Sequence, residues 1–109
     1  MSASVSSTSP PRRRVLIVDD EKGIREALTQ VLEYEEIAVQ ACGSGHEAVR
    51  VYPDFRPHLV FLDVKMEGMD GLETLKRLRE LDPQAQVVMI TGHAPIQTAV
   101  EATQLGAYD

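Results

Sequence analysis

The sequence predicts an α/β domain built on a doubly wound parallel sheet, and three observations support this prediction. Short apolar runs alternate along the chain with segments whose apolar residues recur every three or four positions. The runs lack alternating polar residues, which is typical of strands buried on both faces. Three of the runs end in polar side chains, at Asp19, Asp63 and Thr91. Because strands that alternate with helices form parallel sheets with right-handed crossovers, these side chains are expected at one sheet edge.

The first two strands are predicted over residues 14–18 and 37–41, with a helix over residues 22–34 between them. The helix carries an apolar stripe at offsets of three and four that should bury one side. That stripe comprises Ile24, Ala27, Leu28, Val31 and Leu32. The remaining long polar side chains, Arg25 among them, are expected to lie in water.

Three further helices and two strands complete the predicted alternation. Ser44 with Glu47 is a capping-box signature for a helix that should end near Tyr52, before Pro53. A strand is predicted over residues 58–63 and another over residues 87–91. The other two helices are expected from Asp70 to Leu81, with leucines at 72, 75, 78 and 81, and from Pro95 to Gly106.

Composition limits the possible classes of function. A chain of 109 residues with a net charge of −6 is long enough for one small domain, and an acidic domain is a poor partner for nucleic acid. Residues 1–13 are predicted to form a disordered tail and residues 14–109 the domain. The single cysteine, Cys42, fits a cytoplasmic location, and no apolar run is long enough for a membrane span.

The polar residues at the strand ends suggest metal-assisted phosphoryl chemistry. Asp19, Asp20 and Asp63 should converge if the first and third strands are neighbours, and a hard cation such as Mg²⁺ would offset their repulsion. Asp63 is then placed as a nucleophile of the aspartyl-phosphate kind. The hydroxyl of Thr91 could bond a phosphoryl oxygen, and Gly92 leaves room for its approach.

Four motifs together resemble the receiver domain of two-component response regulators. They are Val15–Glu21, Leu59–Asp63, Gly68–Gly71 and Val88–His93. The resemblance implies a three-layer, flavodoxin-like sandwich with strand order 2-1-3-4, and a phosphoacceptor rather than an enzyme.

The resemblance also assigns roles to individual residues. It implies that Asp63 accepts phosphate from a sensor histidine kinase and that Thr91 is the switch hydroxyl. Mg²⁺ would be held by Asp19, Asp20, Asp63 and the backbone carbonyl of Lys65.

The segment from Thr91 to Asp109 looks most like receivers of the nitrogen-regulator, sigma-54-dependent class. That likeness implies an output domain or partner regulator, with transcription as the regulated process. The family's fifth strand, with its lysine, and its fifth helix have no counterpart before Asp109, so we expect a truncated receiver that could complete itself as a homodimer. No direct nucleic acid or membrane contact by this domain is expected.

Three other functions remain to be weighed against phosphorylation. A receiver-like interaction or dimerisation module that is never phosphorylated is the main alternative. A metal-dependent phosphohydrolase usually needs a second carboxylate two positions after the nucleophile, where this chain has Lys65. A nucleotide-binding domain needs a glycine-rich loop, whereas only Gly23 follows the first strand closely. Cys42, His58 and Met66 are expected to have structural roles.

Overall fold

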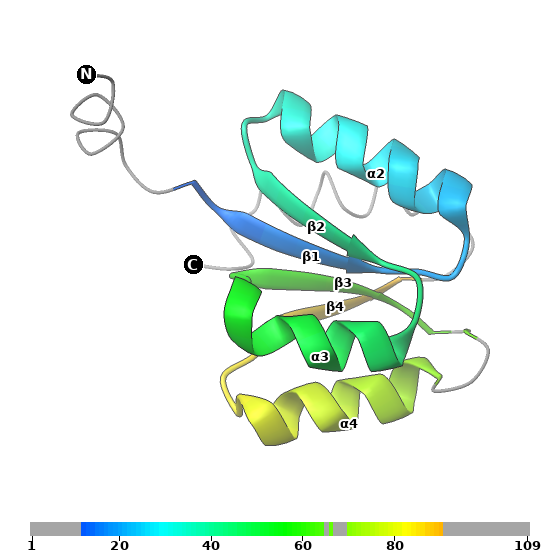
Figure 1. The fold of residues 1–109 in the computed structure, drawn as a ribbon, viewed down its shortest axis with the longest axis vertical. Helices are drawn as coiled ribbons and strands as arrows, with labels where there is room; N and C mark the ends of the chain where they lie inside the picture. The colour runs from blue at the N-terminus through cyan, green and yellow to red at the C-terminus, as the bar shows by residue number, and fades with distance from the viewer. Residues whose placement is uncertain (1–11, 65, 67–69, 91–109) are drawn as a thin grey trace.

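A parallel four-stranded sheet forms the centre of the domain. The computed structural model describes residues 12–64, 66 and 70–90. The strands are β1 (Arg14–Val18), β2 (Ala38–Cys42), β3 (Leu59–Asp63) and β4 (Val87–Ile90), and they lie in the order β2-β1-β3-β4 (Figure 1). The helices are α2 (Lys22–Tyr34), α3 (Gly45–Phe55) and α4 (Gly71–Leu81). This arrangement confirms the predicted α/β class, the parallel sheet and the strand order.

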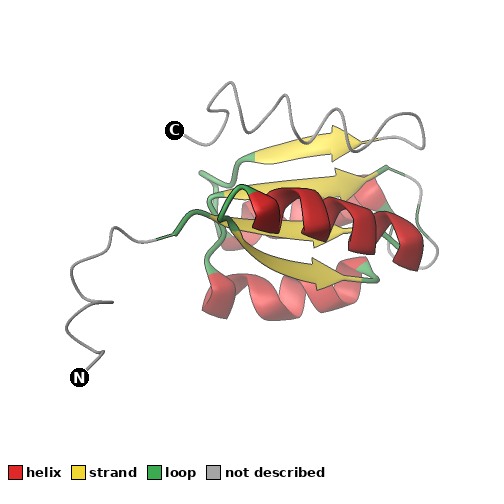
Figure 2. Ribbon diagram, turned by 90° about the horizontal axis from the view of Figure 1, so that it is seen from above, coloured by secondary structure: helices red, strands yellow, loops and turns green. Residues whose placement is uncertain are grey.

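The sheet separates two hydrophobic clusters because successive strand side chains point to opposite faces. On one face, Leu16 and Leu62 pack with Tyr52 of α3 and Leu78 of α4. On the other face, Ile17 and Phe61 pack with Leu28 and Leu32 of α2 and with Ile37, which precedes β2. Figure 2 shows the sheet between α2 and the α3–α4 pair, which confirms the expected three layers.

The register of the sheet brings the ends of the inner strands together. Val18 lies opposite Leu62, so the residues that follow β1 stand beside the end of β3. Asp63 lies opposite Ile90, and the Val64 N–H donates to the Ile90 carbonyl at 3.1 Å. The carboxyl ends of β1, β3 and β4 therefore meet at one edge, as the sequence predicted.

Helix ends follow the capping chemistry of the sequence, with one correction. The side chain of Ser44 accepts a hydrogen bond from the Glu47 N–H, and that of Asp70 accepts one from the Glu73 N–H. The prediction that Pro53 ends α3 is wrong, because the helix continues to Phe55. Proline has a helical φ, although it removes one donor and its ring crowds the carbonyl of the preceding turn. The Arg56 N–H still closes the last turn on the Tyr52 carbonyl.

The leucines predicted along α4 lie on the observed helix but differ in burial. Leu78 is fully buried, whereas Leu72 and Leu81 are exposed. Each step of three residues falls about 60° short of a full turn, so the two end leucines lie on opposite sides of the helix. Thr74 is buried, and its hydroxyl is satisfied there because it donates to the Asp70 carbonyl at 2.8 Å.

Smaller differences concern the chain before β1 and the edge strand. β2 is shifted by one residue from the predicted 37–41. Arg12 and Arg13, expected in the tail, contact the chain where β2 begins, through the Glu36 carbonyl and the Ala38 N–H. Residues 1–11 and the helix predicted from Pro95 to Gly106 lie outside the described residues. None of the described helices combines the length and apolar character needed to cross a membrane.

Candidate functional site

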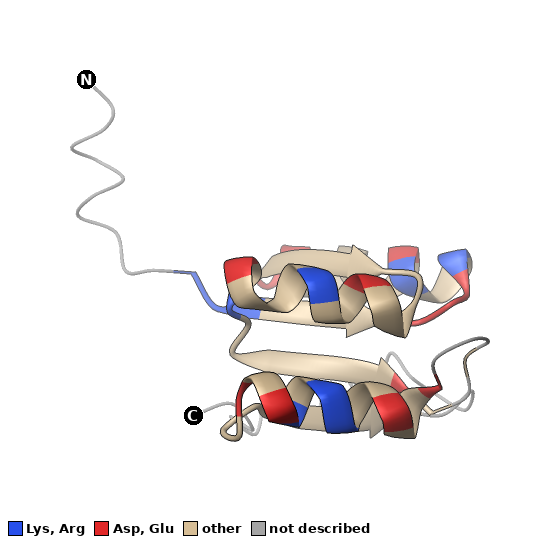
Figure 3. Ribbon diagram, turned by 60° about the horizontal axis from the view of Figure 1, so that its bottom comes forward, with Lys and Arg blue, Asp and Glu red and all other residues tan. Residues whose placement is uncertain are grey.

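Three carboxylates gather at the carboxyl edge of the sheet. Asp19, Asp20 and Asp63 each offer an oxygen, and these oxygens all lie within 4.8 Å of one another. Asp19 is buried, Asp63 is half-buried and Asp20 is exposed. Figure 3 shows acidic residues where the strands end and basic residues where β1 begins. The predicted convergence of these three residues is confirmed.

The pairing of β1 with β3 explains why residues so distant in sequence meet. Asp63 is the last residue of β3, while Asp19 and Asp20 directly follow β1. The Asp19 N–H donates to the Cys42 carbonyl at 3.1 Å, which ties the end of β1 to the end of β2. The sheet therefore fixes the backbone on which all three carboxylates stand.

The electrostatic setting of Asp19 is unfavourable for a carboxylate without a cation. Burial and, to a smaller degree, the negative charges of Asp63, Asp20 and Glu21 together raise the pKa of Asp19 to about 6. The Glu21 N–H donates to Asp19 Oδ1 at 2.8 Å, and this bond opposes the increase in pKa. A bound cation would stabilise the ionised form.

The donor set fits a hard divalent cation. All three side chains offer carboxylate oxygens, which Mg²⁺ prefers together with retained waters and phosphate oxygens. One of the three is exposed, so water and a small anion have access from solvent. The arrangement is the acidic triad expected of a receiver magnesium site.

Two residues contact the backbone at this edge in ways that the sequence did not reveal. The Arg25 side chain, expected in water, is half-buried and its Nη1 donates to the Asp19 carbonyl at 2.8 Å. Gly71 begins α4 against the backbone that follows Asp63, where a Cβ would come within 2.7 Å of the Val64 Cα. Side-chain reach and close backbone approach both depend on tertiary structure, so neither role had a signal in the sequence.

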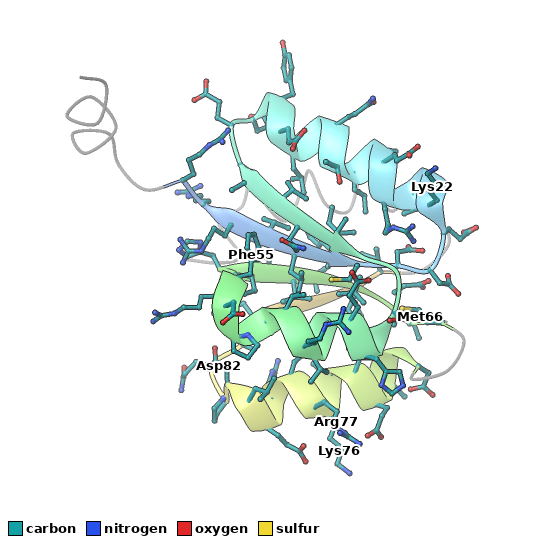
Figure 4. The ribbon with its side chains drawn as sticks, in the orientation of Figure 1. Lys22, Phe55, Met66, Lys76, Arg77 and Asp82 are labelled. Atoms are coloured by element: carbon teal, nitrogen blue, oxygen red, sulfur yellow. The ribbon has the colours of Figure 1, made fainter. Side chains whose placement is uncertain are left out.

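Met66, which was expected to serve in packing, is buried. Its side chain is only 8% exposed and belongs to the cluster on the α3–α4 face. Figure 4 places Met66 and Lys22 at the same end of the sheet, and Phe55 and Asp82 at the other. The structural roles predicted for Cys42 and His58 are also confirmed: Cys42 is fully buried, and His58 Nδ1 accepts from the Arg14 N–H at 2.9 Å.

The other predicted site residues fall on chain that the structure does not describe. Lys65, Thr91 and Gly92 lie outside the described residues. The residue before Thr91 is described, and it pairs with Asp63 across β3 and β4.

Fold and site together define a phosphoacceptor class of protein, and a comparison of families agrees. The model of the response regulator receiver domain matches residues 15–109. The chain therefore belongs to the response regulator receiver domains, whose members accept phosphate rather than act as catalytic enzymes.

Known relatives span several kinds of regulator. The nitrogen assimilation regulatory protein NtrX of Azorhizobium caulinodans is 40% identical over 97 residues, which cover 87% of this chain and 21% of NtrX. The sporulation initiation phosphotransferase F of Bacillus subtilis is 37% identical over 94 residues, covering 86% of this chain and 76% of the relative. The chain thus spans about a fifth of the length of NtrX and most of the length of the phosphotransferase.

A solved relative carries the group that the acidic site suggests. The response regulator TrrA of Thermotoga maritima, in complex with Mg²⁺ and BeF, superposes with a TM-score of 0.70 at 30% identity. The match covers 84% of this chain and 79% of TrrA. Receiver domains as a class interact with histidine kinases and other signalling proteins, as in the complex of CheX with CheY from Borrelia burgdorferi.

Proposed function

We propose that this chain is the phosphoacceptor domain of a two-component system, in which Asp63 takes a phosphoryl group from the phosphohistidine of a sensor kinase. The observation that carries the proposal is the meeting of Asp19, Asp20 and Asp63 within 4.8 Å at the end of the sheet. Three crowded carboxylates have little structural use without a cation, and a cation beside a half-buried carboxylate suits phosphoryl transfer.

The side chain of Asp63 is the one group of this chain that forms a covalent bond in the proposed reaction. A carboxylate oxygen of Asp63 attacks phosphorus, and the P–N bond to the kinase histidine breaks. The electron pair of that bond stays on the imidazole nitrogen, which takes a proton from solvent. Bound Mg²⁺ would offset the negative charge on the transferring phosphoryl oxygens.

The remaining roles follow from the family and are part of the proposal. Asp19 and Asp20 would bind Mg²⁺ with Asp63 and the Lys65 carbonyl. Thr91 would bond a phosphoryl oxygen, and Gly92 would leave space for it. The role of Thr91 is supported by the pairing of Asp63 with Ile90, the residue before Thr91.

We also infer an output in transcription. The likeness to NtrX supports a regulator of the nitrogen class, and the coverage of 21% of that relative supports further domains beside the receiver in the intact protein. Residues 1–13 would be a tail and residues 14–109 the receiver, acting in the cytoplasm on an output domain or partner regulator.

The proposal is tested by intact mass spectrometry after incubation with MgCl₂ and acetyl phosphate. One phosphoryl adduct is expected on the parent, none on Asp63→Asn, and one on the matched control Asp54→Asn, which changes an exposed carboxylate of α3. An adduct of equal yield on Asp63→Asn, or none on a folded parent protein that binds Mg²⁺, would contradict the proposal.

A further inference from the structure

The guanidinium of Arg25 reaches back from the first turn of α2 to the end of β1. Its backbone N–H makes a helical bond to the Glu21 carbonyl at 3.1 Å, so its main chain is fixed in the helix. Its Nη1 donates to the Asp19 carbonyl at 2.8 Å, and the side chain is half-buried. A charged donor on a backbone carbonyl is a stronger bond than a neutral one.

The same guanidinium lies over Gly43 in the loop between β2 and α3. A Cβ at position 43 would be 3.2 Å from Arg25 Nη1 and 3.6 Å from its Cζ. The loop is itself fixed, because the Gly43 N–H donates to Glu47 Oε1 at 3.0 Å and the Glu47 N–H donates to Ser44 Oγ at 3.1 Å. Arg25 therefore packs against a firm surface rather than extending into solvent.

Asp19 is consequently held on both sides of its peptide unit. Its N–H donates to the Cys42 carbonyl, and its carbonyl accepts from Arg25. The carbonyl of Asp19 is part of the peptide bond to Asp20, so the bond from Arg25 restrains the orientation of both acids. Mutual repulsion of the three carboxylates acts in the opposite direction, tending to move this segment away from Asp63.

We propose that Arg25 is a positioning residue for Mg²⁺ binding: by holding the Asp19 carbonyl against the β2–α3 loop, it keeps Asp19 and Asp20 in place beside Asp63. The inference rests on the proposed function, since it concerns the same metal site. Residues outside a metal's direct ligands that orient them commonly change metal affinity by about 10-fold to 100-fold when replaced.

The test measures Mg²⁺ affinity by titrating ¹⁵N-labelled full chain with MgCl₂ and following amide shifts at the end of β3. Arg25→Gln should weaken binding by about tenfold. Arg25→Lys should restore part of the loss, because an ammonium keeps the charge without the planar fork. Lys22→Gln removes the same charge from the same helical turn and should change the affinity by no more than about twofold, because an exposed charge is screened.

A second variant separates positioning from a purely structural role. Gly43→Ala should displace the guanidinium without altering Arg25 itself, and should weaken Mg²⁺ binding in the parent but not in the Arg25→Gln background. Unfolding in urea, measured on the same samples, checks that each variant is folded.

Three results would overturn the inference, and they are distinguishable. Equal Mg²⁺ affinity for Arg25→Gln and the parent would overturn it while leaving the proposed function intact. An equal effect of Gly43→Ala in both backgrounds would mean that the glycine acts independently of Arg25. No saturable shift in the folded parent would overturn the inference together with the proposed metal site.

Discussion

Gly71 lies directly against the backbone of Val64, the residue after Asp63, so that the start of α4 and the end of β3 touch through main-chain atoms. The Gly71 N–H donates to the Val64 carbonyl at 3.2 Å. A Cβ at position 71 would come within 2.9 Å of the same carbonyl oxygen, closer than side-chain carbons approach in real structures. The site carboxylate therefore stands on a strand end that a neighbouring helix fixes by close contact.

Gly71→Ala is expected to destabilise the domain, although alanine is the better helix former. Overpacking at a rigid backbone contact costs about 1–3 kcal/mol, which exceeds the gain of up to about 1 kcal/mol in helix propensity. Urea unfolding followed by circular dichroism gives the free energy. The control is Gly23→Ala in α2, where a Cβ meets nothing within 4 Å and the change should be neutral or stabilising. If both glycines respond alike, the close contact has no energetic role.

Tyr52→Phe is expected to lower the free energy of unfolding by about 1.5–3 kcal/mol, because the Tyr52 hydroxyl donates to Asp82 Oδ2 at 2.9 Å and so links α3 to the residue that ends α4. Burial and this bond both raise the pKa of the Tyr52 phenol. Tyr34→Phe is the matched control, since Tyr34 is 87% exposed and should show almost no change. Equal stability of Tyr52→Phe and parent would argue against the link.

His58 is expected to make the domain less stable in acid. Its Nδ1 accepts from the Arg14 N–H, and burial together with the charges of Arg14 and Arg13 lowers its pKa from the usual 6.5. The unfolded chain then binds the proton more readily, so the free energy of unfolding falls as the pH drops from above 6.5 through the folded-state pKa.

The contribution of His58 is isolated by comparing variants, because Asp19 changes the stability with pH in the opposite direction. The pKa of Asp19 is raised from 3.8 to about 6, so lowering the pH through that range favours the folded state. His58→Gln should show a smaller loss of stability between neutral and acid pH than the parent, whereas His46→Gln, at an exposed position, should match the parent. Identical pH profiles for the parent and His58→Gln would refute this prediction.

Asp63→Asn is expected to stabilise the protein in EDTA and to remove its response to Mg²⁺. The charge of Asp63 raises the pKa of Asp19, so neutralising it relieves repulsion worth up to about 1 kcal/mol at a partly exposed site. In the parent, added MgCl₂ should raise the melting temperature by selective binding to the folded state. A variant that still gains the full Mg²⁺-dependent stabilisation would exclude Asp63 as a ligand.

The sequence predicted most of the fold because its signals are local. Apolar runs gave β1, β3 and β4 to within one residue, and the cap at Asp70 with its Glu73 partner marked the start of α4. The exceptions also have physical causes. α3 passes through Pro53 and closes its last turn with a bond to Tyr52, and Thr74 is buried with its hydroxyl satisfied by the Asp70 carbonyl.

The sequence predicted which acidic residues form the site and at which strand ends they lie. Asp19, Asp20 and Asp63 follow buried strands, and parallel strands deliver their carboxyl ends to one edge, so their meeting follows from the alternation of elements. The contacts that hold these acidic residues in place could not be predicted. Arg25 looked like a solvent-facing helix residue, because spacing along a helix gives a direction but not the path of a long side chain.

What the sequence determined by itself is therefore the parallel α/β fold and the three acids at its edge, since periodicity and strand-end position are properties of neighbouring residues. Only the tertiary structure decided how that edge is held: the bond from Arg25 to Asp19 and the contact of Gly71 with the strand carrying Asp63. Both join segments distant in the chain, and distances between such segments are set by packing of the whole domain.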